Sequence, residues 1–276
     1  MNYEIMNNVL IIRDLSQFNI THILECGQFF RYKKQDNKYV IYSLNEFATA
    51  TIYSDRCEIE CSNINYFINF FDLNTNYEII KNKLSAKNEF LNNAIKFGYG
   101  IRILKQDIFE TFVSFIISAN NNIKRIQNSI EKICTMFGTK MNNFYAFPTL
   151  NQLLKSSIQD FKNCGLGYRA EQLFKALRQI NNQTLIDLSQ LKTSELTSSL
   201  QKFSGIGPKV ADCIMLFGYG RQDVFPVDTW IEKAYNSFNK VKLNNRIQIR
   251  KNLVKSFKNL SGYAQQYLFY YKRSQK

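Results

Sequence analysis

A lysine and an aspartate in the last third of the chain have the types and spacing for nucleophilic chemistry. Lys209 follows a glycine-rich turn, and Asp228 comes nineteen residues later, directly after Phe225-Pro226-Val227. A neutral amine can attack an electrophilic carbon and form a Schiff base. A helix N-terminus and partial burial would lower the pKa of Lys209, whereas bound phosphates would raise it. Asp228 could cap a following helix, stabilise a developing cation or move protons.

The turn before this lysine predicts a contact with phosphate. It reads Ser204-Gly205-Ile206-Gly207-Pro208, in which the glycines supply positive φ angles and close backbone approach, and Pro208 suits the first position of a helix. Such a turn directs main-chain N–H groups and a helix N-terminus outward, where they can receive a phosphate. We therefore expect Gly205, Ile206 and Gly207 to anchor a phosphodiester backbone beside a nucleophile.

The composition favours a polyanionic partner. The chain has 276 residues, 45% of them hydrophobic, and a formal net charge of +14 with a pI near 9.4. Large cores and salt-sensitive binding to nucleic acid follow from these values. The six cysteines are scattered and His22 is the only histidine, so we expect reduced thiols and no metal site. No stretch reads as a membrane span or a targeting signal, and we expect a cytoplasmic protein, nucleoid-associated in a prokaryote.

Hydrophobic periodicity divides the chain into two parts. Before about residue 65, apolar and polar residues alternate as in β-strands, over residues 39–42, 48–53 and 57–61. Asp107–Ala119 is apolar almost all round, which indicates a helix inside a core. The pattern predicts an α+β fold, in which an antiparallel sheet domain with returning helices (1–98) packs on an all-helical domain (99–276).

Further helices are expected wherever the period of apolar residues is close to 3.6. These segments are Tyr77–Leu84, Asn88–Phe97, Lys124–Phe137, Thr149–Lys155, Arg169–Ile180, Asp187–Leu191, Ser194–Phe203, Pro208–Phe217, Thr229–Phe238, Asn245–Val254 and Gly262–Tyr271. The hairpin that precedes Lys209 thus lies between two of them.

Several motifs together resemble a known family. Leu200–Tyr235 resembles the helix–hairpin–helix plus Gly/Pro–Asp motif of DNA glycosylases. Four further stretches narrow the resemblance to the 8-oxoguanine DNA glycosylase family; they are Gly27–Tyr32 (GQFFRY), Ser114–Ile126 (SFIISANNNIKRI), Gly165–Ala170 (GLGYRA) and Tyr263–Phe269 (YAQQYLF). A Gly-x-Gly hairpin alone is common, whereas five motifs in the family's order along the whole chain are specific.

The resemblance implies roles for individual residues. Lys209 matches the family's catalytic lysine and Asp228 its catalytic aspartate, which implies a bifunctional glycosylase and abasic-site lyase. The target base must leave the duplex to be reached. In the family, a glycine carbonyl accepts N7–H of 8-oxoguanine, a cysteine and a phenylalanine stack on the base, and a glutamine binds its Watson–Crick edge. The matching residues here are Gly27, Cys213, Phe269 and Gln265.

The resemblance also implies contacts with the opposite strand. Four residues match positions that fill the gap left by the base and contact the estranged cytosine, namely Asn120, Arg125, Tyr168 and Arg169. This chain departs from the family two residues after the aspartate, where animal members carry a histidine and this chain has Trp230. A 5′-phosphate contact is therefore not supported at this position, and the opposite-base preference stays open.

The resemblance implies a monomeric enzyme without metal or organic cofactor that acts on double-stranded DNA containing 8-oxoguanine. Other functions stay open at this point. An endonuclease III-like glycosylase for oxidised pyrimidines would share the hairpin, the lysine and the aspartate, but that branch usually carries a four-cysteine iron–sulfur loop and no cysteine follows Cys213. A monofunctional alkyl-base glycosylase would lack the hairpin lysine. A helix–hairpin–helix module that only binds DNA would not need Lys209 and Asp228 together.

Overall fold

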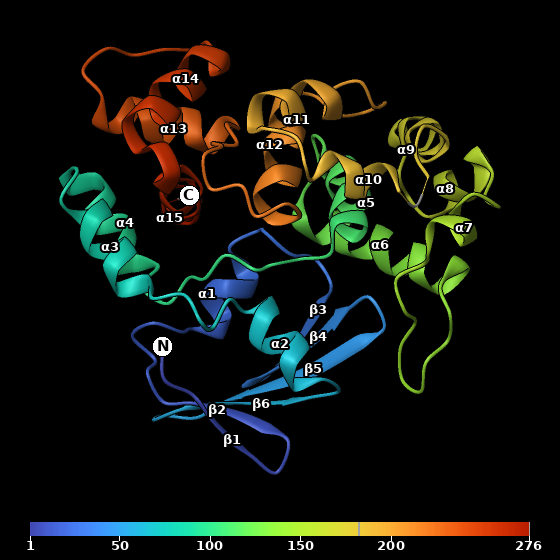
Figure 1. The fold of residues 1–276 in the computed structure, drawn as a ribbon, viewed down its shortest axis with the longest axis horizontal. Helices are drawn as coiled ribbons and strands as arrows, with labels where there is room; N and C mark the ends of the chain where they lie inside the picture. The colour runs from blue at the N-terminus through green and yellow to red at the C-terminus, as the bar shows by residue number, and fades with distance from the viewer. Residues whose placement is uncertain (182, 276) are drawn as a thin grey trace.

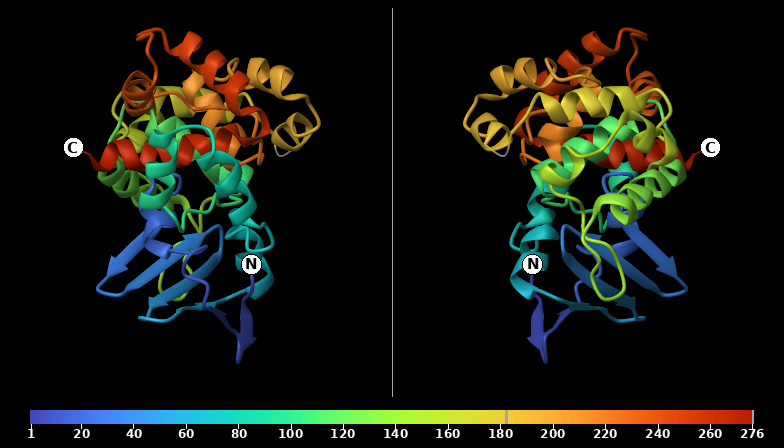
Figure 2. Two further views of the ribbon diagram at one scale, coloured as in Figure 1. Left: turned by 90° about the vertical axis from the view of Figure 1, so that its left-hand side faces the viewer. Right: turned by 90° about the vertical axis from the view of Figure 1, so that its right-hand side faces the viewer.

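An antiparallel sheet forms one layer of the molecule (Figure 1). The computed structural model describes residues 1–181 and 183–275. Within them the six strands lie in the order β1-β2-β6-β5-β4-β3. Their bounds are β1 Glu4–Met6, β2 Val9–Ile12, β3 Tyr32–Gln35, β4 Lys38–Ser43, β5 Glu46–Ile52 and β6 Cys57–Cys61. Figure 2 shows the sheet below the helices, with the β1-β2 hairpin pointing away from them.

The strands that were expected from alternation have one buried face. In β6, Cys57, Ile59 and Cys61 are buried, whereas Glu58 and Glu60 lie on the more open face. Side chains on a strand alternate between its faces, so the buried set forms one stripe. The antiparallel sheet is thus confirmed, although β1, β2 and β3 were not foreseen because they are short or, in β3, mostly polar.

Helices make up most of the remaining chain, and nearly all expected helical segments are present. In the sheet part they are α1 Ile20–Glu25 and α2 Ile64–Phe70, and then come α3 Tyr77–Ser85, α4 Glu89–Phe97, α5 Ile108–Ser118, α6 Ile123–Phe137, α7 Leu150–Leu153 and α8 Ile158–Asn163. The later helices are α9 Arg169–Arg178, α10 Thr184–Leu188, α11 Thr193–Leu200, α12 Pro208–Phe217, α13 Thr229–Phe238, α14 Arg246–Phe257, the 3-10 helix η1 Lys258–Leu260 and α15 Ser261–Ser274.

Some helices differ from the sequence expectation. The short helices α1, α2 and α8 were not predicted, since six or seven residues hardly establish a period. The segment expected at Asp187–Leu191 is helical at Thr184–Leu188 instead. The Asn181 carboxamide oxygen accepts the main-chain N–H of Thr184 at 2.8 Å and starts the helix earlier. Among the described helices, none is long and apolar enough to cross a membrane.

The apolar side chains form adjoining cores. One lies between the sheet and α1 and α2, and another surrounds α5 and α12. A further core joins Leu84, Leu91 and Ile95 of α3 and α4 to residues of α13, α14 and α15. Helices α3 and α4, which the division at 98/99 assigns to the first domain, therefore pack on the C-terminal helices, as Figure 1 shows. The division itself stays a prediction.

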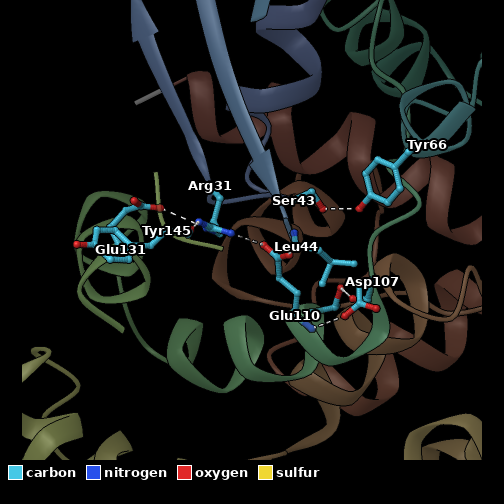
Figure 3. Close-up of polar contacts among 9 residues, drawn as sticks. Arg31, Ser43, Leu44, Tyr66, Asp107, Glu110, Glu131 and Tyr145 are labelled. Atoms are coloured by element: carbon cyan, nitrogen blue, oxygen red, sulfur yellow. Dashed lines mark hydrogen bonds and ion pairs between the residues drawn. The ribbon is translucent and has the colours of Figure 1, made fainter. Parts of the chain in front are cut away.

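A buried polar network fastens the sheet to the helices (Figure 3). Arg31, which is 1% exposed, precedes β3 and lies between two carboxylates, 3.9 Å from Glu110 of α5 and 3.3 Å from Glu131 of α6. Its Nη2 also donates to the carbonyl oxygen of Tyr145 at 2.7 Å. Glu110 in turn accepts the main-chain N–H of Leu44, in the β4-β5 turn, at 2.8 Å. Buried charges need such partners, and here the partners come from both layers.

Candidate active site

A cavity of about 460 Å³ opens where the loop before β3 meets the ends of five helices, α5, α6, α12, α13 and α15. A volume of this size suits a ligand the size of a nucleobase. Its lining comes from both ends of the chain and consists of Gly27, Phe30, Phe115, Ser118, Asn121, Asn122, Ile123, Lys124, Ile126, Lys209, Asp228, Trp230, Phe269 and Arg273. It brings four sequence-predicted residues together, namely Gly27, Lys209, Asp228 and Phe269.

Lys209 projects from the first turn of α12, which Pro208 begins as expected. Its Nζ lies 5.6 Å from the centroid of the Phe115 ring. Burial disfavours the charge of Lys209, but the Cys213 sulfur, which also hydrogen-bonds the amine, and the Asp228 carboxylate outweigh burial, so the pKa of Lys209 is raised above its ordinary value. The sequence argument required a lowered pKa, and the free protein has the opposite shift. In the free protein the amine of Lys209 is therefore mainly protonated near neutral pH.

Asp228 caps α13 and faces the cavity at the same time. Its Oδ1 accepts the main-chain N–H groups of Trp230 and Ile231, both at 2.9 Å. These bonds hold the carboxylate at the helix mouth, next to the site of Lys209. The capping role and the position required for a catalytic role thus coexist, as the sequence suggested.

Gly27 lies in a loop that needs glycine. Its φ is +84°, and a Cβ at this position would lie 2.9 Å from Nη1 of Arg273 and 3.1 Å from the Phe269 ring. The loop is fastened from two sides. The fully buried Gln28 side chain donates to the Arg102 carbonyl oxygen at 2.7 Å, and Gln266 of α15 donates to the Cys26 carbonyl oxygen at 2.9 Å.

Two further predicted pocket residues lie deeper. Cys213 follows Lys209 by one turn of α12 and is 3% exposed, and burial raises the pKa of its thiol to about 11, so the thiol is neutral at neutral pH. Gln265 is 5% exposed on α15, one turn before Phe269, and its Oε1 is buried with no hydrogen-bond partner among the described residues. Neither belongs to the cavity lining of the described chain. Their contacts with a base stay predictions.

The residues assigned to the opposite strand gather around the loop between α5 and α6. Asn120 has a φ of +47°, and its carbonyl oxygen accepts Nη2 of Arg169 at 2.5 Å. The Arg169 Nε also donates to the Ala119 carbonyl oxygen at 2.5 Å, and the residue is 5% exposed. Arg169 therefore braces this loop from inside the protein. Tyr168 is 56% exposed and Arg125 is exposed as well, so both can reach a partner.

The hairpin before α12 has the geometry of an anchor. Gly205 has a φ of +81°, as expected, but Gly207 has a φ of −87° and is the N-cap of α12, which corrects the expectation that both glycines adopt positive φ. Nothing lies within 4 Å of a Cβ built on Gly207, so this surface is open to a partner's backbone. Ile206 is 5% exposed and pins the turn to the helical core.

Sequence reasoning missed Phe30, Phe115, Lys124 and Arg273 as cavity residues. Phe30, Phe115 and Lys124 lie in or beside the motifs, but the motifs give no indication of which side chains face inward. Arg273 follows Phe269 by four residues, and this helical spacing was the available signal. Within the described ranges, no group of three or more His, Cys, Asp or Glu side chains could hold a metal ion.

Two family models match consecutive parts of the chain. Residues 10–112 match the 8-oxoguanine DNA glycosylase, N-terminal domain, and residues 113–259 match the HhH-GPD superfamily base excision DNA repair protein. The second match alone covers more than half of the chain.

Relatives among known proteins and a solved structure agree with these two family models. The chain is 32% identical over 152 residues to N-glycosylase/DNA lyase of Saccharomyces cerevisiae (49% of this chain, 40% of that protein) and 29% identical over 228 residues to a probable N-glycosylase/DNA lyase of Methanothermobacter thermautotrophicus (74% and 72%). The match thus spans less than half the length of the yeast relative.

The structure of Clostridium acetobutylicum 8-oxoguanine glycosylase/lyase in complex with double-stranded DNA containing cytosine opposite 8-oxoguanine superposes with a TM-score of 0.93. It is 37% identical, and the match covers 100% of this chain and 98% of that one. This extent and identity, together with the two family models, show that the chain belongs to the 8-oxoguanine DNA glycosylase family.

Proposed function

We propose that this protein excises 8-oxoguanine from duplex DNA and then cleaves the abasic strand by β-elimination. The observation that carries the proposal is the single cavity that Gly27, Lys209, Asp228 and Phe269 enter from four separate segments. A base-binding loop, a nucleophile, a carboxylate and a stacking ring are the parts that removal of a flipped base requires.

The cavity supplies complementary groups for the base. The Gly27 carbonyl is the acceptor for N7–H, which 8-oxoguanine has and guanine lacks. Phe269 provides a ring on which the base stacks. The unpaired Oε1 of Gln265 accepts from N1–H and the amino group of the Watson–Crick edge, which removes the cost of a buried acceptor without a partner.

The chemistry follows from the Lys209–Asp228 pair. Nζ of neutral Lys209 forms a bond to C1′ as the bond between C1′ and N9 breaks, and the base leaves with the electron pair and takes up a proton. The Asp228 carboxylate stabilises the positive charge on the sugar. The adduct nitrogen loses a proton, and its lone pair forms a C=N bond to C1′ as the C1′–O4′ bond breaks and O4′ takes up a proton. In this Schiff base, loss of a C2′ proton supplies the electron pair of the C2′–C3′ double bond and expels the 3′ phosphate, and water then adds at C1′ and releases Lys209.

Duplex DNA is the partner that the surface and the relatives support. The net charge of +14 attracts phosphates, and the open turn at Gly205–Gly207 presents a helix N-terminus to the backbone. The Clostridium acetobutylicum relative was solved with such DNA. The proposal includes a monomer that acts in the cytoplasm, at the nucleoid in a prokaryote. The six cysteines, free and buried in the described chain, are consistent with a reducing compartment.

Borohydride trapping tests the nucleophile. The protein is incubated with a duplex that contains 8-oxoguanine opposite cytosine, and a covalent adduct is expected for wild type but not for Lys209→Gln. Lys124→Gln is the matched control, because Lys124 also lines the cavity. If trapping survives Lys209→Gln and is lost in Lys124→Gln, the nucleophile is Lys124 and the proposed role of Lys209 is wrong.

Two comparisons separate the alternatives. Asp228→Asn retains an N-cap but removes the charge, so it should slow excision with little effect on DNA binding. A parallel duplex with an oxidised pyrimidine distinguishes an endonuclease III-like activity. If wild type cleaves that duplex and leaves 8-oxoguanine intact, the proposed substrate is wrong. If it binds both and cuts neither, the protein is a binding module.

A further inference from the structure

Arg273 lines the cavity, and its guanidinium has hydrogen-bond capacity that no group in the described chain satisfies. The guanidinium carbon Cζ of Arg273 lies 5.1 Å from the centroid of the Phe269 ring, and Nη2 donates to the main-chain carbonyl oxygen of Glu25. Nη1 is buried and has no hydrogen-bond partner within the described chain. The same atom lies 2.9 Å from the place a Cβ on Gly27 would take. A buried donor without a hydrogen-bond acceptor therefore lies beside Gly27, and both residues line the cavity.

A guanidinium can only donate, so the missing partner is an acceptor. Leaving a buried donor unpaired is costly, and an incoming acceptor removes that cost. The imidazole ring of 8-oxoguanine carries N7–H beside C8=O8, a donor next to an acceptor. Guanine carries a bare N7 acceptor beside C8–H. An acceptor from Gly27 and a donor from Arg273 would together match the 8-oxoguanine pair and mismatch guanine.

The order of residues along α15 selects O8 rather than O6. Gln265, Phe269 and Arg273 are spaced by four and lie on one face of the helix. A purine stacked on Phe269 with its Watson–Crick edge toward Gln265 turns its opposite end, which carries C8, toward Arg273. O6 belongs to the Watson–Crick edge and lies on the Gln265 side.

We propose that Arg273 is a specificity-determining residue that donates from Nη1 to O8 of the flipped base. The inference rests on the proposed function and adds a direct reading of the oxidised position. Two residues of α15 then bind opposite ends of the base, Gln265 at the Watson–Crick edge and Arg273 at O8.

The test compares Arg273→Met with Gln266→Met under single-turnover conditions. Both substitutions remove a bond from α15 to a main-chain carbonyl at the C-terminal end of α1, but only Arg273 lines the cavity. Each protein is given two duplexes, one with 8-oxoguanine opposite cytosine and one with a preformed abasic site. Binding to 8-oxoguanine and guanine duplexes is measured alongside.

Arg273→Met should lower the rate of 8-oxoguanine excision about tenfold or more, since a charge-assisted hydrogen bond in a dry pocket is lost. Cleavage of the abasic duplex should stay within twofold, and the preference in binding for 8-oxoguanine over guanine should fall. Gln266→Met should retain that preference. An equal loss of preference in both variants, or an unchanged excision rate in Arg273→Met, would overturn the inference. Failure of wild type to excise 8-oxoguanine would instead overturn the proposed function.

Discussion

Glu110→Gln is expected to change the pH dependence of stability. Glu110 is 3% exposed; its Oε2 accepts the N–H of Leu44, and its Oε1 lies 3.9 Å from Arg31 without a hydrogen bond among the described residues (Figure 3). Burial raises the pKa of Glu110 to about 7 from its ordinary value of 4.5, because Arg31 offsets only part of the lost hydration. Glutamine keeps an acceptor for Leu44 and cannot ionise.

The sign and size follow from linkage. The folded state holds the Glu110 proton more tightly than the unfolded state, so between pH 4.5 and 7 the unfolded state releases it first and stability falls as the pH rises. The loss is absent well below pH 4.5 and complete above pH 7. A shift of about 2.5 pKa units corresponds to roughly 3 kcal/mol, of which about 2.5 kcal/mol develops between pH 5 and 8. The free energy of unfolding of Glu110→Gln, relative to that of wild type, should therefore rise by about 2.5 kcal/mol from pH 5 to pH 8.

Urea unfolding at pH 5, 6, 7 and 8 measures the difference. Glutamine also differs from the protonated glutamic acid in its hydrogen bonds, and this difference does not depend on pH, so the slope against pH and not the absolute stability carries the information. Glu131→Gln is the matched control, because Glu131 contacts the same arginine but its side chain is 36% exposed. Stability curves of wild type and Glu110→Gln that run parallel from pH 5 to 8 would refute the reasoning.

Other substitutions test the cavity and its support. Gly27→Ala should weaken binding of 8-oxoguanine duplexes about tenfold, because φ +84° strains any residue with a side chain and the added methyl group would lie 3.1 Å from the Phe269 ring; titration by fluorescence anisotropy checks this, and unchanged affinity would show that the loop relaxes. Arg169→Met should destabilise the fold by about 3 kcal/mol, since main-chain carbonyls of the α5–α6 loop lose a buried donor, and urea unfolding measures it. The raised pKa of Lys209 predicts single-turnover excision that rises tenfold per pH unit between pH 6 and 8, and a flat profile would mean that substrate binding alone removes the proton.

The sequence predicted elements where one physical signal dominates. Pro208–Phe217 and Thr229–Phe238 were bounded correctly because a proline after glycine and an aspartate cap mark their starts unambiguously. Short elements such as α1 and β3 were missed, since a few residues with mixed polarity carry no period. Tertiary bonds, such as that from Gln28 to Arg102, hold these parts in place.

The site was predictable only in part. Lys209 and Asp228 became candidates through the hairpin and its spacing, but their catalytic roles came from the resemblance. Gly27 and Phe269, which are 242 residues apart, entered through the resemblance alone. Arg169 shows why residue type does not decide a role, because a guanidinium suited to reading a base is bound to main-chain carbonyls instead. Its contact with the opposite strand would need the α5–α6 loop to give up those bonds.

The charge of Lys209 depends on neighbours that no local pattern reveals. Burial favours the neutral amine, yet Cys213 and Asp228 face the same ammonium and outweigh burial. A flipped base that fills the cavity and displaces water would shift this balance toward the neutral amine. The neutral amine would then be more populated when a base lies in the cavity than in the free protein, which limits the reactivity of Lys209 toward intact DNA.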